Sequence, residues 1–144
     1  HLRRSLDIEA MRLAIPQLVG ERDFKAFQAV GCQARTTIRR INHIEIEEKL
    51  SSEGGRLEGC SIHIHGDAFL KNMVRIMVGS LVEVGLKKRP HRWIDEVLKE
   101  GDRTKAGMTT PASGLSLIEV KWPDPWTGIV RRPLQRGREG DATP

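Results

Sequence analysis

The chain has 144 residues, a length that corresponds to one globular domain or to a part of a longer protein. Its 24 lysines and arginines exceed its 19 aspartates and glutamates, and the resulting net charge of +5 favours an anionic partner, with nucleic acid as the leading candidate. Aromatic residues make up only 4% of the chain and tyrosine is absent, which argues against binding of single strands mainly by base stacking on aromatic rings.

The first predicted element is a helix over residues 8–19, where apolar side chains recur at helical spacing. Asp7 is a suitable N-cap, and Gly20 follows the last turn as a C-terminal stop. A short helical turn is expected after Asp23, and an irregular basic segment follows over residues 31–37. The N-terminal part is therefore predicted to be one helix and a long structured connection.

Two segments alternate apolar and polar residues as half-buried strands do, over residues 41–47 and 57–65. Ile44 and Ile46 would share the buried face of the first of them. The residues between them, 51–56, are polar or glycine and form a loose hairpin loop. The pattern predicts an antiparallel hairpin with one apolar face.

Residues 67–85 place one arginine inside a strongly apolar helical pattern. At 100° per residue the apolar side chains cover a broad arc, which leaves a narrow polar stripe. The stripe contains Lys71, Asn72, Arg75, Gly79 and Glu83. Gly79 costs about 1 kcal/mol of helix propensity relative to alanine, which indicates that another backbone or a ligand comes close beside Arg75. The stripe is either a solvated face of an ordinary core helix, or the site of a partly buried Arg75 aimed at a carboxylate or phosphate.

The remaining pattern predicts a short helix over residues 90–100 that ends at Gly101. An ordered loop rich in small residues is expected over 102–113, and a final strand over 115–122. Residues 124–144 have almost no apolar pattern, so we expect a disordered tail there. The predicted domain therefore covers residues 1–123.

The predicted order of elements is α, β, β, α, α, β, which defines an α+β fold. Helices would cover one face of a small, mainly antiparallel sheet of three strands in a two-layer domain. The other face or an edge stays open, which indicates that a missing partner segment completes the sheet.

Basic and hydroxyl side chains gather before the first predicted strand, at Arg35, Thr36, Thr37, Arg39 and Arg40. Phosphate contacts use such groups, although a solvated charged surface is the simpler alternative. His63 and His65 share one face of a strand, but the sequence offers no third ligand and we predict no metal site. No glycine-rich phosphate loop is present, so no nucleotide cofactor is expected.

The two cysteines, Cys32 and Cys60, match neither a zinc-ligand spacing nor a disulfide framework, and we expect free thiols in a reducing compartment. No apolar run reaches the roughly 18 uncharged residues of a membrane span, and the first residues lack a signal-peptide pattern. We expect a soluble intracellular protein without membrane association, in the cytoplasm or, in a eukaryote, in the mitochondrion.

Three separated blocks resemble the tRNA pseudouridine synthase A family in order and spacing. They are Phe-Gln-Ala-Val-Gly-Cys-Gln-Ala-Arg-Thr-Thr-Ile-Arg (27–39), Phe-Leu-Lys-Asn-Met-Val-Arg (69–75) running on to Val-Gly-Ser-Leu (78–81), and Asp-Arg-Thr (102–104) with Pro-Ala-Ser-Gly-Leu (111–115). The resemblance covers residues 6–123 and corresponds to the C-terminal half of the family. It implies half of a pseudouridine synthase fold and isomerisation of uridine to pseudouridine in the anticodon stem-loop of tRNA. The family needs no cofactor: the glycosidic bond is cleaved, the base rotates, and it is reattached through C5.

The resemblance also implies roles for single residues. Arg75 matches the arginine that pairs with the catalytic aspartate of the family. Leu115, which follows Gly114, matches the apolar position that lines the uracil pocket. Phe69 and Asn72 are further expected substrate-binding residues, and the expected phosphate contacts are Arg35, Arg39, Arg40 and Lys71.

Two family motifs are absent from the chain, the Gly-Arg-Thr-Asp-Ala-Gly type that carries the catalytic aspartate and the Arg-Tyr type that carries the active-site tyrosine. Both belong to the N-terminal half. The chain alone is therefore expected to be inactive, and its expected partners are tRNA, its own N-terminal half and, because bacterial members are dimers, a second copy. A noncatalytic RNA-binding domain and a dimerisation domain are the alternatives. A partly buried Arg75 favours a divided active site, and a fully exposed one favours plain RNA binding.

Overall fold

The structure is a computed structural model that describes residues 5–120. The chain divides into two compact units with the boundary between Ala112 and Ser113. The described residues of the first unit contain three α-helices and three β-strands. The predicted α+β class is confirmed. The predicted tail over residues 124–144 lies outside the described residues.

The first helix, α1, spans Ile8–Leu18 and is capped as predicted. The Asp7 side chain accepts a hydrogen bond from the backbone N–H of Ala10 at 3.0 Å, which satisfies one of the unpaired donors of the first turn. Gly20 has a φ of +103°, a conformation that favours glycine, and the chain turns there directly into β1 (Gly20–Asp23). The turn leads the chain from α1 into the edge strand of the sheet.

Two further helices follow the hairpin, α2 over Met73–Gly85 and α3 over Trp93–Glu100. The predicted apolar arc of α2 is buried, and its fully enclosed side chains are Met73, Ile76, Met77 and Leu81. Gly101 adopts a left-handed conformation and ends α3, as the sequence indicates. None of the helices in residues 5–120 has the length and apolar character needed to cross a membrane.

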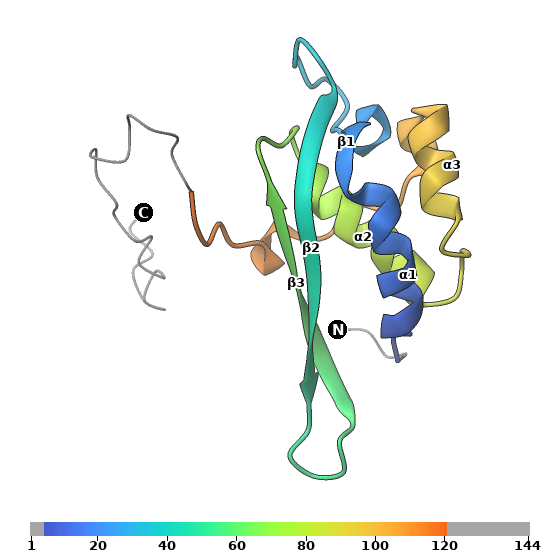
Figure 1. Ribbon diagram of the computed structural model, residues 1–144, viewed down its shortest axis with the longest axis vertical. Coiled ribbons are helices and arrows are strands. Elements are labelled where there is room, and N and C mark those ends of the chain that lie inside the picture. Colours follow the sequence, from blue (N-terminus) through green and yellow to red (C-terminus); the bar gives the residue numbers. More distant parts are fainter. Residues whose placement is uncertain (1–4, 121–144) are drawn as a thin grey trace. The chain divides into compact units, whose positions relative to one another are not determined.

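The sheet has the order β1-β2-β3, and both pairings are antiparallel. β2 (Ile38–Leu50) and β3 (Leu57–Gly66) form the predicted hairpin, which is longer at both ends than the apolar pattern indicates. The isoleucines of β2 at 41, 44 and 46 are buried. Figure 1 shows the three helices gathered on one side of the sheet. The fold is therefore a two-layer α+β arrangement.

The third strand of the sheet is β1, and the prediction of a strand over residues 115–122 was wrong for the residues that the structure describes. Residues 115–120 form no strand, and residues 121 and 122 lie outside the described range. β1 has the sequence Gly-Glu-Arg-Asp and a mostly exposed surface. It pairs through its backbone at the edge of the sheet, so it carries no apolar alternation by which it could be recognised.

A short 3-10 helix, η1 (Lys25–Phe27), confirms the helical turn expected after Asp23. The rings of Phe24 and Phe27 meet edge to face with their centroids 5.9 Å apart, and both are fully buried. These rings join the helices and the sheet into one core, in which each large apolar side chain contributes about 1.5–3 kcal/mol by its burial. The core holds the N-terminal end of α2 and the loop after β1 in fixed positions.

Candidate active site

A loop from the C-terminal part of the first unit lies directly on the polar stripe of α2. A Cβ atom at Gly79 would lie 1.8 Å from the backbone oxygen of Met108, and one at Gly107 would lie 2.6 Å from the backbone nitrogen of Ser80. Two glycines thus let the backbones of helix and loop touch. The prediction that another backbone comes close at Gly79 is confirmed.

Ser80 fixes the loop on the helix. Its side chain is fully buried, and its hydroxyl donates to the backbone oxygen of Ile76 at 2.9 Å. Oγ of Ser80 also accepts a hydrogen bond from the backbone N–H of Gly107 at 2.9 Å. Because both groups are buried, an unmade bond here would cost about 1–3 kcal/mol, and the loop is held firmly at this point.

Arg75 is half-buried, and its guanidinium is oriented by two neutral oxygens. Nε donates to the backbone oxygen of Thr110 at 2.7 Å, and Nη1 donates to Oδ1 of Asn72 at 3.2 Å. Thr110 in turn donates its backbone N–H and its hydroxyl to the backbone oxygen of Arg75, at 3.3 and 3.0 Å. Residues 75 and 110 are therefore joined by three hydrogen bonds.

A guanidinium has five N–H groups, and within residues 5–120 Arg75 uses two of them. The N–H groups left over include both on Nη2 and one on Nη1. These two nitrogens form the outer fork of the side chain, which matches the two oxygens of a carboxylate. The arrangement can hold one carboxylate by a bidentate, charge-assisted pair while the inner side of the guanidinium stays bound to Thr110.

The model of the tRNA pseudouridine synthase family matches residues 14–123 of the chain. The chain belongs to this family. It is 46% identical over 122 residues to the tRNA pseudouridine synthase A of Syntrophotalea carbinolica, an alignment that covers 85% of this chain and 46% of that protein. Synthases of the same name from Geotalea uraniireducens and Myxococcus xanthus are 45% and 44% identical over 120 and 119 residues, and these alignments cover 83% of this chain and 46% and 43% of those proteins. The chain therefore spans about half the length of the curated relatives it matches.

The cations expected to contact phosphate in this member of the synthase family are not all brought together. Arg39 and Arg40 are consecutive on β2, so their side chains leave opposite faces of the strand. Arg39 Nη1 donates to the backbone oxygens of Thr36 and Ile38, at 2.9 and 2.7 Å. Arg40 forms an ion pair with Glu21 at 3.2 Å. The compact cluster predicted from the sequence is thus divided between two faces, because β2 begins at Ile38 rather than at Ile41.

The charges of Arg39 and Lys71 both act on the thiol of Cys32. Hydrogen bonds from the backbone of Ala34 and of Lys71 lower the pKa of the Cys32 thiol, and the positive charges of Lys71 and Arg39 lower it further. The opposite holds at the other cysteine, where burial and the charge of Glu48 raise the pKa of Cys60. The surroundings of Cys32 therefore favour a negative charge.

The other expected substrate-binding residues lie at different places. Asn72 has a left-handed backbone with φ +61° and serves as the partner of Arg75 Nη1. Phe69 is 40% exposed and packs over Gly66, where a Cβ would lie 3.0 Å from its ring. Arg35 is exposed in the loop before β2. Leu115 is 49% exposed and belongs to the second unit, which is described separately.

His63 and His65 lie on β3 opposite Glu45 and His43 of β2. The rings of His65 and His43 have their centroids 5.6 Å apart, and Nε2 of His63 lies 3.4 Å from Glu47. Among residues 5–120, no group of three or more potential ligand side chains is placed to hold a metal ion.

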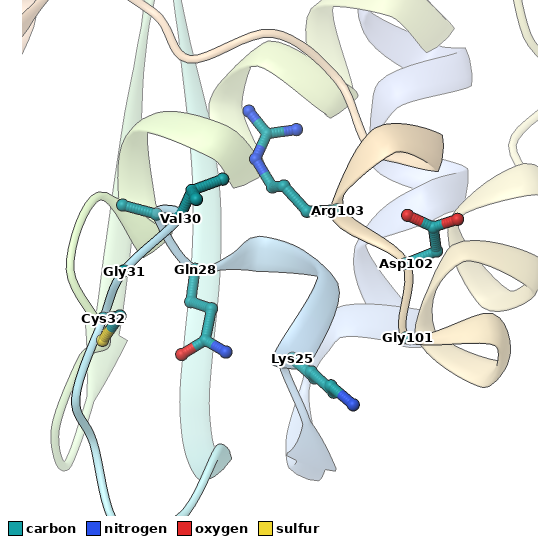
Figure 2. A pocket seen from close by; sticks show the side chains of 9 residues that line it. Lys25, Gln28, Val30, Gly31, Cys32, Gly101, Asp102 and Arg103 are labelled. Carbon is teal, nitrogen blue, oxygen red and sulfur yellow. The ribbon is translucent and has the colours of Figure 1, made fainter.

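An open hollow that includes Cys32 in its lining is bounded on one side by residues 28–32 and on the other by residues 101–103 (Figure 2). Figure 2 shows that the Arg103 side chain points away from Lys25 and Asp102. Its Nη1 donates to the backbone oxygen of Gly107 at 2.9 Å, and its Nη2 donates to Oγ1 of Thr109 at 3.1 Å. Sequence reasoning assigned no role to Arg103 or Thr110. The available signal was the pair of glycines at 79 and 107, which marks a backbone contact without identifying the side chains around it.

Proposed function

We propose that this chain is the C-terminal half of a tRNA pseudouridine synthase that isomerises uridine to pseudouridine in the anticodon stem-loop. The observation that carries the proposal is the half-buried Arg75, which Thr110 and Asn72 orient while three N–H groups of its outer fork have no partner among residues 5–120. Family membership supports the same assignment. The preceding half would supply the catalytic aspartate to that fork, and tRNA would bind across both halves.

In this proposal Arg75 keeps the aspartate ionised and aimed. A neighbouring positive charge favours the charged form of a carboxylate, and a bidentate pair fixes its plane. Attack of the aspartate on the ribose and removal of a proton by it both require the ionised form, so Arg75 serves either course of the reaction. The bond to Thr110 fixes the guanidinium before the substrate arrives, which avoids a cost of ordering it in the transition state.

We further propose that Arg35, Arg39 and Lys71 contact tRNA phosphates. Phe69 would be a further substrate contact, and Leu115 of the second unit would line the pocket of the reacting base. The lowered pKa of Cys32, to which the backbone of Ala34 and Lys71 and the charges of Lys71 and Arg39 contribute, supports an anion site near this thiol. Arg40 contributes less net charge, because Glu21 pairs with it. A tRNA substrate implies an intracellular enzyme. Within residues 5–120 no strand pairs with the outer edge of β3, and the N-terminal half or a second copy of the chain would bind there.

Cys32 provides a probe of this surface. Because its pKa is lowered and that of Cys60 is raised, iodoacetamide is expected to alkylate Cys32 faster than Cys60 near neutral pH. In the complete enzyme, saturating tRNA should slow the alkylation of Cys32 and leave that of Cys60 unchanged. Mass spectrometry of the two cysteine peptides over time measures both rates. Equal protection of the two cysteines, or none at Cys32, would contradict the proposed phosphate contacts.

If the catalytic aspartate and Arg75 belong to different halves of the enzyme, the complete enzyme should be active and the purified chain inactive. Reattachment through C5 displaces the hydrogen on that carbon, so tRNA labelled with tritium at C5 of uridine reports the reaction as released tritium. The purified chain is expected to release none above background, and the complete enzyme that contains it is expected to turn over. Release of tritium by the purified chain alone would refute the assignment of the catalytic aspartate to the absent half.

The alternative of plain RNA binding is less well supported by the geometry. It calls for an exposed Arg75 in a continuous basic stripe, whereas Arg75 is half-buried and bonded to neutral oxygens. An arginine used only for phosphate contact does not need its Nε fixed in this way.

A further inference from the structure

Arg103 directs its charge into its own loop. Its side chain is half-buried, and the two hydrogen bonds that it makes go to a backbone oxygen and a threonine hydroxyl of residues 107 and 109. Within residues 5–120 it forms no ion pair with a carboxylate. Its bonds therefore shape the loop.

The loop shaped by Arg103 is the one that holds Arg75. Gly107 accepts from Arg103 through its backbone oxygen and donates its backbone N–H to Oγ of Ser80, so one residue joins the arginine to α2. Three residues later, Thr110 accepts the hydrogen bond from Arg75 Nε. Every link from Arg103 to Arg75 is a hydrogen bond of 2.7 to 3.3 Å or the chain itself.

We infer that Arg103 is a positioning residue for the reaction, acting through residues 107–110 on the guanidinium of Arg75. The inference rests on the proposed function, because it assigns Arg103 to the same carboxylate-binding fork. The bond from Nε to Thr110 sets the direction of the outer fork of Arg75, since the guanidinium is planar and rigid. A shift of about 1 Å in Thr110 turns that fork away from the carboxylate, and displacements of this size cost up to about 100-fold in rate.

The experiment uses the complete enzyme with two independent variants, Arg103→Ala and Thr109→Val. Arg103→Ala removes both hydrogen bonds of the Arg103 guanidinium, and Thr109→Val removes only the bond to Thr109. Because valine has nearly the shape of threonine, the second variant tests the inference even if Arg103→Ala impairs folding. The single-turnover rate is expected to fall about 10-fold for Arg103→Ala and less for Thr109→Val, while tRNA affinity changes by less than about twofold. Arg56→Ala is the control, because it removes the same charge from an exposed hairpin loop and should retain the wild-type rate.

A double-mutant cycle with Arg75→Lys distinguishes action through Arg75 from an independent contact. If Arg103 acts through Arg75, Arg103→Ala should lower the rate by no more than about twofold once Arg75 is lysine. Multiplicative losses, or a loss of tRNA affinity at an unchanged rate, would overturn the inference and make Arg103 a contact of its own. If Arg75→Lys itself leaves the rate unchanged, the proposed function fails as well, so the two failures are distinguishable.

Discussion

Replacement of Arg75 by lysine in the complete enzyme is expected to lower the single-turnover rate of pseudouridine formation about 100-fold, with tRNA affinity nearly unchanged. Lysine keeps the charge and much of the length but has a single nitrogen. Arg75 bonds Thr110 with Nε and Asn72 with one N–H of Nη1, while the other N–H of Nη1 and both of Nη2 have no partner within residues 5–120, and one ammonium cannot serve both sides. The carboxylate of the preceding half would keep a positive neighbour and lose the fork that aims it.

Single-turnover tritium release and direct tRNA binding measure the two quantities separately. Arg12→Lys is the matched control, since Arg12 lies on α1 and its partners are Glu9, Glu48 and the backbone oxygen of Ile46 rather than the loop that holds Arg75. That variant should react at the wild-type rate. If Arg75→Lys instead reacted as fast as the wild type and bound tRNA several-fold more weakly, Arg75 would be a phosphate contact.

The helices and the hairpin could be predicted because their signals are local. Asp7 caps α1 through its own side chain, and the apolar arc of α2 follows from the spacing of its residues. β1 could not be predicted, because an exposed edge strand is held by the backbone of its neighbour and needs no particular side chains. The opposite error occurred at residues 115–122, where apolar alternation predicted a strand and residues 115–120 form none. Alternation indicates a strand only where a neighbouring strand provides the backbone hydrogen bonds.

The site shows the same limit. Gly79 indicated a close backbone contact, because glycine in a helix carries a cost that some contact must offset. The glycine could not indicate which backbone makes the contact. That backbone is Met108, which lies about 30 residues further along the chain in a loop without regular secondary structure. The division of Arg39 from Arg40 likewise depends on the start of β2, and strand ends are the least certain part of a sequence pattern.

Gly79→Ala is expected to abolish most of the activity of the complete enzyme, with a loss of about 100-fold or more, although alanine is the better helix former. The new Cβ would lie 1.8 Å from the backbone oxygen of Met108, so the loop has to move away from α2. Residues 107–110 then lose the contacts to Ser80 and Arg75 that hold them.

Two opposing terms decide the stability of this variant. Alanine favours α2 by about 1 kcal/mol, whereas forcing apart a packed contact costs about 1–3 kcal/mol and the unmade bond to Ser80 about 1–3 kcal/mol more. The unfolding temperature should therefore fall, while the rate collapses. Gly59→Ala is the control, because Gly59 lies in β3 with open space around its Cβ position and should keep both stability and rate. A Gly79→Ala enzyme with the wild-type single-turnover rate would show that the position of the loop, and with it the bond from Thr110 to Arg75, has no bearing on the reaction.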